Sequence, residues 1–212
     1  AGLKRVNYTY DALGNVAQVT YEPFNDIELM RHRYTYDEDG RLIQAFVSTY
    51  DSQYGEVSET NVADYSYYMH GPLKRVELGN GIQGVDYVYT IQGWLKAMNN
   101  PDKTLDPGQD GNDLFGMRLD YFSGDYVNQD DLYPPVATTD PSGNSLDKYN
   151  GTIVSQKWWT DTLGKFNAFP GNTLAYNYTY DSKYQLKNAY LASLNTGTGT
   201  YEFQGDKFKW GI

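Results

Sequence analysis

Aromatic and polar positions alternate in short stretches of this chain, in the order Tyr-x-Tyr. Residues two apart lie on the same face of a strand, so both tyrosines share one face and the residue between them faces the other. Apolar residues resume after a short turn sequence, which predicts a second strand. The pattern therefore predicts a series of β-hairpins. The five tyrosine pairs are Tyr8 and Tyr10, Tyr34 and Tyr36, Tyr65 and Tyr67, Tyr87 and Tyr89, and Tyr178 and Tyr180.

The sequence Asp-x-x-Gly follows the fullest copies and predicts the turn of each hairpin. It begins at Asp11 and ends at Gly14, and it recurs between Asp37 and Gly40. Aspartate is favoured at the first position of a type I turn because its carboxylate accepts a local backbone N–H. Glycine then supplies positive φ, which predicts a three-residue loop that closes with a bulge.

The looser copies keep only part of this turn sequence. Tyr68 and Thr90 stand where aspartate is expected before Gly71 and Gly93, which removes one local hydrogen bond but no backbone requirement. In the last copy, Asp181 is followed by a tyrosine at the glycine position, Tyr184. If Tyr184 adopts the left-handed backbone of the turn glycine, the strain costs about 1 kcal/mol; otherwise the last hairpin uses a different turn type.

The spacing of the repeats indicates how the hairpins are arranged. Gly14, Gly40, Gly71 and Gly93 are separated by 26, 31 and 22 residues. A closed propeller needs blades of nearly constant size, so this spacing favours an open, winding sheet. The predicted fold class is all-β, with stacked antiparallel hairpins that form a spiralling strip.

The Tyr-x-Tyr and Asp-x-x-Gly pattern weakens in the middle of the chain. Residues 99–150 are rich in turn-forming residues there and predict loops. Residues 114–122 predict a further strand that ends at 123–125, and 130–146 predict another loop. Trp158 and Trp159 point to opposite faces if their segment is extended, so one of them is expected to pack against the tyrosines. The glycine-rich residues 79–84 lack the Lys-Ser/Thr ending of a phosphate-binding loop and predict a turn between strands.

Composition excludes several classes of partner and site, namely nucleic acid, a membrane-spanning helix and cysteine-based sites. The chain has 212 residues, 22 of them tyrosine, a net charge of −10 and no cysteine. No cluster of Lys and Arg suggests nucleic-acid binding, and no apolar run approaches the about 18 residues of a membrane-spanning helix. Without cysteine there is neither a disulfide framework nor a thiolate metal site. The chain starts within a repeat and shows no signal peptide, so we expect a fragment of a longer protein.

The candidates for chemistry are weak. Acidic residues between Asp106 and Asp113 do not match a calcium loop, because its third and twelfth positions would be Gly108 and Met117. His32 and His70 are isolated, which makes them poor material for a zinc site or a triad. Carboxylate pairs suited to glycoside hydrolysis can be drawn in several ways. They include Asp120 with Asp125 and Asp130 with Asp131. We predict no catalytic residue, no metal ligand and no cofactor.

The repeat itself resembles that of a known family. Tyr-x-Tyr-Asp-x-x-Gly-x-Leu resembles the YD repeat of the Rhs family, which is shared with the C components of bacterial Tc toxins and with animal teneurins. Residues 70–79 and 83–96 are similar to Rhs-repeat proteins of Bacteroidetes in particular. Residues 115–126, 149–151 and Trp158 extend this likeness over nearly the whole chain.

The resemblance implies a strip of hairpins that spirals into a hollow β-shell, with 1–212 as one repeat region and 99–150 as degenerate repeats. Shells of toxin members hold a C-terminal effector domain, and teneurins are extracellular adhesion receptors. The expected function is thus a structural shell segment of a secreted or cell-surface bacterial protein. Its partners would be the rest of its shell and a C-terminal effector or another chain.

Two further expectations concern alternatives. An adhesion module that recognises glycans or a partner protein through its aromatic surface is the second reading, favoured if the tyrosine rings form an exposed row. Toxin members also self-cleave through paired aspartates in Asp-Pro contexts. Asp106-Pro107 and Asp140-Pro141 occur here without the surrounding arginine and tryptophan pattern, so that activity is not expected.

Overall fold

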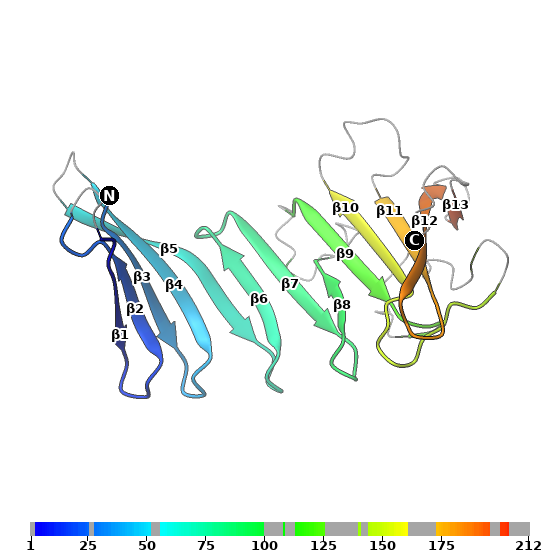
Figure 1. Ribbon diagram of the computed structural model, residues 1–212, viewed down its shortest axis with the longest axis horizontal. Helices are drawn as coiled ribbons and strands as arrows, with labels where there is room; N and C mark the ends of the chain where they lie inside the picture. The colour runs from blue at the N-terminus through cyan, green and yellow to red at the C-terminus, as the bar shows by residue number, and fades with distance from the viewer. Residues whose placement is uncertain are drawn as a thin grey trace. The chain divides into compact units, whose positions relative to one another are not determined.

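The computed structural model describes residues 3–25, 28–51, 56–99, 108, 113–125, 140, 144–160, 173–195 and 200–203. The chain divides into two compact units, Ala1–Gly84 (the N-terminal unit) and Val85–Ile212 (the C-terminal unit). The division falls within one strand, β7 (Gln83–Tyr89), which is labelled in Figure 1.

The N-terminal unit is a sheet in which each strand pairs antiparallel with the strand that follows it in sequence. Figure 1 shows that its three hairpin turns, β1–β2, β3–β4 and β5–β6, lie at the same end of the strands. Its strands are β1 (Val6–Tyr10), β2 (Val16–Tyr21), β3 (Met30–Tyr36), β4 (Leu42–Asp51), β5 (Glu56–Tyr67) and β6 (Leu73–Leu78).

The same sequential, antiparallel pairing holds in the C-terminal unit. The described residues of the chain contain strands and turns but no helix. The prediction of an all-β fold built from stacked antiparallel hairpins is therefore confirmed. The strands of this unit are β7 (Gln83–Tyr89), β8 (Leu95–Met98), β9 (Phe115–Asp120), β10 (Ser155–Thr160), β11 (Thr173–Tyr180), β12 (Leu186–Asn195) and β13 (Thr200–Phe203).

The two faces of the N-terminal sheet differ in chemistry. Cross-strand pairs such as Tyr8 with Val19 and Tyr65 with Val76 place the repeat tyrosines and small apolar residues together, on what we call the tyrosine face. The opposite face carries ion pairs and hydrogen bonds; Arg33, for example, pairs with Glu59 at 2.6 Å and lies over the ring of Phe46. Buried residues of the tyrosine face are small, because the larger tyrosines flank and cover them. They are Val19, Ala45, Ala63 and Val76.

Buried apolar residues lie on several strands of the C-terminal unit and between them. Trp159 is buried there, whereas its neighbour Trp158 stacks on Tyr176 with ring centroids 5.4 Å apart. The two tryptophans thus lie on opposite faces of the strand, and Trp158 packs on a tyrosine, as predicted for one of them. The strand predicted at 114–122 is β9. The buried apolar residues of this unit are Leu119, Tyr121, Leu146, Val154, Trp159, Leu174, Ala175, Leu191 and Ala192.

The turns follow the predicted chemistry. Gly14 and Gly40 have φ of 90° and 74°, and the strand register shifts by one residue at the second tyrosine of the hairpin, which marks a bulge. Asp11 and Asp37 each accept two backbone N–H groups of the turn at 2.8–3.0 Å. The glycine-rich residues 79–82 connect β6 to β7, with the Ile82 N–H donating to Leu78 O at 3.0 Å. The strand-linking turn predicted at 79–84 is confirmed for residues 79–82, whereas residues 83 and 84 already belong to β7.

Two of the looser turns can be compared with the full copies. Thr90 Oγ1 accepts the Trp94 N–H at 3.1 Å, whereas Asp11 and Asp37 each accept two backbone N–H groups, so the threonine makes one local hydrogen bond fewer, as predicted. At the last turn, Tyr184 adopts φ of 60° and its N–H donates to Asp181 O at 3.1 Å. Asp181 Oδ1 also accepts the Gln185 N–H at 2.9 Å. Tyr184 therefore occupies the left-handed position of the same turn type, and the alternative turn is excluded.

Replacing Tyr184 with glycine is expected to stabilise the chain by about 1 kcal/mol, because the left-handed backbone no longer strains an L side chain. The ring is 59% exposed, so little packing is lost. Urea unfolding of Tyr184→Gly measures the gain, and Gly40→Ala, which introduces a side chain at φ of 74°, is the opposite control. An unchanged or lower midpoint in Tyr184→Gly would contradict the assignment.

Candidate functional site

Consecutive hairpins are joined by the hydroxyl of the second tyrosine of a repeat. In the N-terminal unit, Tyr36 Oη donates to Val16 O at 2.8 Å and Tyr67 Oη donates to Leu42 O at 2.7 Å. We call this contact the tyrosine latch. Burial raises the pKa of both tyrosine side chains, so the neutral hydroxyl that donates the bond is favoured.

The C-terminal unit repeats the latch twice. Tyr180 Oη donates to Ile153 O at 2.6 Å, and Tyr121 Oη donates to Leu95 O at 2.7 Å. In all four latches the accepting carbonyl belongs to the residue two positions after a turn glycine with positive φ. Tyr121 lies outside the Tyr-x-Tyr pairs, so the sequence pattern did not identify it as a repeat residue.

A further copy of the turn lies in the region predicted to be loop. The Asn144 N–H and Nδ2 donate to the two carboxylate oxygens of Asp140, each at 2.9 Å. Asn15 makes the same two bonds to Asp11, at 2.8 and 2.9 Å, and both turns share the sequence Asp-x-x-Gly-Asn. Asp140 thus makes the hydrogen bonds of a turn aspartate within the predicted loop. Its proline neighbour, at 141, lies outside the described residues.

The bulge of the β7–β8 hairpin aims a lysine into the C-terminal unit. Val88 pairs with Ala97 and Tyr89 with Leu95, so Lys96 is the extra, unpaired residue of the bulge. Bulges commonly redirect a side chain in this way. The corresponding bulge residues Lys74 and Lys187 are exposed, whereas Lys96 is only 3% exposed.

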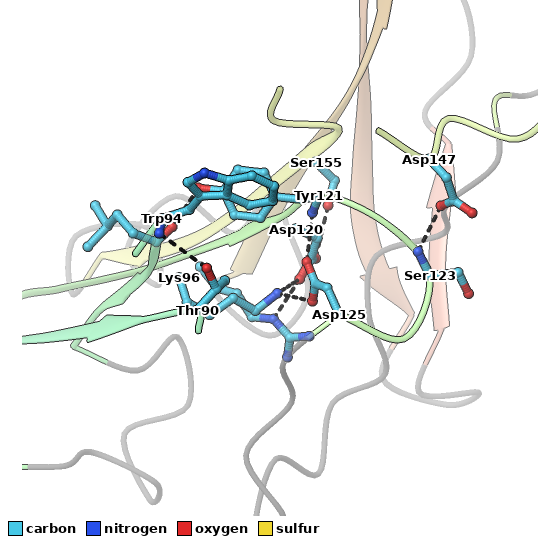
Figure 2. A network of polar contacts seen from close by, with 11 residues as sticks. Thr90, Trp94, Lys96, Asp120, Tyr121, Ser123, Asp125, Asp147 and Ser155 are labelled. Atoms are coloured by element: carbon cyan, nitrogen blue, oxygen red, sulfur yellow. Dashed lines mark hydrogen bonds and ion pairs between the residues drawn. The ribbon is translucent and has the colours of Figure 1, made fainter. Parts of the chain in front are cut away.

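Lys96 meets two buried carboxylates. Its Nζ donates to Asp120 Oδ1 at 2.7 Å and also contacts Asp125 Oδ1. Arg118 Nε donates to the same Asp120 oxygen at 2.9 Å, and Ser155 Oγ donates to the other at 3.0 Å. Figure 2 shows Lys96, Asp125 and Ser155 close to Asp120. Together Lys96, Arg118, Asp120, Asp125 and Ser155 form the Lys96 cluster.

The cluster keeps Asp120 ionised inside the protein. Burial opposes the charge and would raise the pKa of Asp120, but Arg118 and Lys96 attract the carboxylate strongly enough to lower that pKa below its usual value. Lys157 acts in the same direction. Asp120 is 0% exposed and Asp125 is 5% exposed. The pair considered for glycoside hydrolysis is thus enclosed, and its members neutralise lysine and arginine.

The aromatic residues beside the cluster belong to the same network. The rings of Trp94 and Tyr121 lie 5.0 Å apart, and the Tyr121 N–H donates to Asp125 Oδ2 at 2.8 Å (Figure 2). A Cβ added at Gly151 would come within 3.0 Å of the Trp94 ring, so the turn at Gly151 packs closely on that ring. Tyr121 therefore links its latch, at Leu95, to the buried charges.

A second buried polar group holds the end of β8. Asn99 has φ of 47°, and its Oδ1 accepts the Asp86 N–H at 2.7 Å. Its Nδ2 donates to Asp113 Oδ1 at 2.8 Å and to Phe115 O at 3.0 Å. Sequence reasoning placed Asn99 at the start of a loop and missed this role. Its buried amide, at the end of β8, thus hydrogen-bonds to both β7 and the start of β9.

The other candidates are not brought together. His32 lies between the rings of Tyr21 and Tyr34 on the tyrosine face, and His70 stacks on Tyr68 at a turn. Asp130 and Asp131, and most of the acidic stretch that ends at Asp113, lie outside the described residues. Among the residues that the structure describes, no group of three His, Asp or Glu side chains is placed to hold a metal ion, and no helix could span a bilayer.

Comparison with known proteins gives a match in structure. The chain is similar to a crystal structure of TcdB2-TccC3-Cdc42, with a TM-score of 0.55, 17% identity and coverage of 97% of this chain and 9% of that chain. The likeness is one of fold. A crystal structure of TcdB2-TccC3 without its hypervariable C-terminal region matches with a TM-score of 0.45 and 15% identity, again over 97% and 9% of the two chains.

Sequence comparison adds no family. No family model matches the chain, and no curated protein matches it. The match covers only 9% of the chain in the solved structure that shares this fold, so the present chain corresponds to about a tenth of that protein's length. Its function is accordingly a matter for proposal.

Proposed function

We propose that this chain is a structural wall segment of an exported Rhs/YD-repeat shell that encapsulates or presents a C-terminal toxin or effector domain. Within each unit, every hairpin pairs with its sequence neighbours, and tyrosine latches join hairpins through their backbones. Such an array can extend by adding units, which a wall requires. The role proposed for the chain is mechanical, without an enzymatic step.

The repeated latch is the observation that carries the proposal. In each latch the hydroxyl of the second tyrosine is hydrogen-bonded to the neighbouring hairpin. The tyrosines that make these bonds in the repeat, Tyr36, Tyr67 and Tyr180, are also partly buried. The glycan-binding alternative would instead be favoured by an exposed row of aromatic rings. The fold shared with TcdB2-TccC3-Cdc42 and the resemblance of the repeat to the Rhs family support the wall as well.

Protease protection of the full-length gene product tests the proposal. A C-terminal region enclosed by the shell should resist a protease that rapidly digests the same region expressed alone, and electron microscopy should show a hollow particle. Equal digestion rates for the enclosed and the isolated region would refute the proposed role. Cell fractionation of the native host tests export, and retention in the cytoplasm would contradict that part.

A further inference from the structure

The Lys96 cluster brings an amine and a carboxyl group together inside the C-terminal unit. Lys96 Nζ contacts Asp125 Oδ1, and each of the two side chains is 3% exposed. Lys74 and Lys187, which occupy the same bulge position in their hairpins, are exposed. A buried ammonium and a buried carboxylate both lose the hydration that stabilises their charges. A reaction that converts the pair into a neutral group would remove that cost.

The same amine meets a second carboxylate, which can carry a proton. Lys96 Nζ donates to Asp120 Oδ1 at 2.7 Å, and Arg118 Nε donates to that oxygen at 2.9 Å. Ser155 Oγ donates to the other oxygen at 3.0 Å. The neighbouring cations hold Asp120 in its ionised form. A carboxylate within hydrogen-bond reach of the nitrogen can take a proton from it and return that proton within the site.

Hydrogen bonds fix the orientation of the Asp125 carboxyl group. While Oδ1 faces Lys96, Oδ2 accepts the Tyr121 N–H at 2.8 Å. The Asp125 N–H donates to Phe122 O at 3.2 Å, which ties the backbone of the same turn. A backbone N–H aimed at one carboxyl oxygen stabilises negative charge that develops there during attack on the carboxyl carbon. The adjacent rings of Tyr121 and Trp94, 5.0 Å apart, help to enclose the site (Figure 2).

We propose that Lys96 and Asp125 form an intramolecular amide bond, an isopeptide bond, once the C-terminal unit has folded. The ammonium group gives one proton to Asp125 Oδ1, and the neutral Nζ then bonds to Asp125 Cγ. The electron pair of the C=O bond moves to Oδ2, which faces the Tyr121 N–H. Asp120 takes a second proton from Nζ and delivers it to the Oδ1 hydroxyl. That group leaves as water with the electron pair of its bond to Cγ, and the C=O bond re-forms.

The reaction balances within the site. One ammonium and one carboxylate become one neutral amide and one water, and Asp120 ends as the carboxylate that it was at the start. No oxidant, cofactor or second substrate is consumed. Groups held in contact by a fold react with effective molarities on the order of 10⁵ M or more, which favours bond formation between two otherwise unreactive side chains.

The bond would join β8 to the turn that follows β9. Lys96 and Asp125 are 29 residues apart in sequence, so a covalent link between them restricts the unfolded chain. The sequence contains no cysteine, and a disulfide therefore cannot provide such a link. The isopeptide bond goes beyond the proposed wall function, because it forms within one chain whether or not a shell encloses another domain.

Mass spectrometry of the full chain under denaturing conditions tests the proposal. We expect a mass that is lower by one water molecule than the sequence predicts. After digestion with trypsin, the peptides that contain Lys96 and Asp125 should be found linked, and cleavage after Lys96 should be absent because its amine is modified. A mass equal to that of the sequence, with the two peptides separate, would overturn the proposal.

Variants distinguish this bond from loss of water elsewhere in the chain. Lys96→Arg keeps a positive charge but removes the amine, so its mass should be the full mass of its sequence. Lys74→Arg is the matched control and should still lose one water. In Asp125→Asn the same bond should form with loss of ammonia in place of water. Loss of water that persists in Lys96→Arg would place the reaction at another site and overturn the assignment.

Asp120→Asn tests the proton carrier. Because acid–base catalysis by a positioned side chain commonly contributes about 10²-fold or more, bond formation after refolding from urea should slow by at least about that factor. Circular dichroism of the same samples confirms that the variant has folded. Bond formation at the wild-type rate in folded Asp120→Asn would overturn the role given to Asp120, while the mass of the wild-type chain decides the bond itself.

Discussion

Lys96→Ala is expected to lower the free energy of unfolding by about 3–5 kcal/mol, because it removes the cation that contacts both buried carboxylates of the cluster. Lys96 Nζ contacts both Asp120 and Asp125, and all three side chains are nearly inaccessible to solvent. The loss of Coulomb attraction is not replaced by water, since the site is enclosed. Urea unfolding followed by circular dichroism measures the effect.

The chain supplies matched controls for this substitution. Lys74 and Lys187 occupy the same bulge position in their hairpins but are exposed. Lys74→Ala and Lys187→Ala should therefore change stability by less than about 0.5 kcal/mol, as is usual for surface substitutions. If all three alanine variants unfold at the same urea concentration, the Lys96 cluster does not stabilise the C-terminal unit.

Alkaline pH is expected to unfold the C-terminal unit through two tyrosines. Burial, together with the charges of Asp125 and Asp120, raises the pKa of Tyr121 from 10.0 to about 12. Burial, together with Tyr180 and Tyr176, raises the pKa of Tyr178 from 10.0 to about 12. Each raised pKa means that the folded state favours the neutral phenol more than the unfolded chain does.

The sign of the effect follows from that preference. The stabilisation is fully present below pH 10 and is lost as the pH rises toward about 12. In that interval the free energy of unfolding should fall by about 1.4 kcal/mol per pH unit for each of the two tyrosines. Tyrosinate absorbance and circular dichroism recorded on the same samples should show late ionisation coupled to loss of the fold.

Substitution distinguishes the tyrosines that make stability depend on alkaline pH from those that do not. Tyr178→Phe should reduce the dependence of stability on pH above 10, since one buried phenol no longer ionises. Tyr184→Phe, at an exposed ring, should leave that dependence unchanged. Complete tyrosine ionisation with the fold intact would contradict the assignment of Tyr121 and Tyr178.

The hairpins were predictable because their determinants are local. Asp37 and Gly40 fix a turn within a few residues, and Tyr34 and Tyr36 fix a strand face by simple alternation. Tyr184 shows the limit of such local rules, since the other bonds of its turn hold it in the left-handed region despite its side chain.

The buried charges were not predictable for the opposite reason. Lys74, Lys96 and Lys187 follow equivalent turns, and nothing nearby in sequence distinguishes Lys96 from the other two. Its partners lie 24 and 29 residues further along the chain. Only the pairing of β8 with β9 brings them into reach, and that pairing crosses a stretch in which the repeat pattern fades.

Sequential pairing of strands also affects how such a chain can change in evolution. A hairpin that contacts only the hairpin before it and the hairpin after it can be duplicated or deleted as a unit, provided that the new neighbours present the same backbone carbonyl to a latch tyrosine. Side-chain identity matters little at that acceptor, which is valine, leucine or isoleucine in the four latches. Gene recombination between repeats can therefore lengthen or shorten the array wherever no buried charges such as those of the Lys96 cluster bridge the strands.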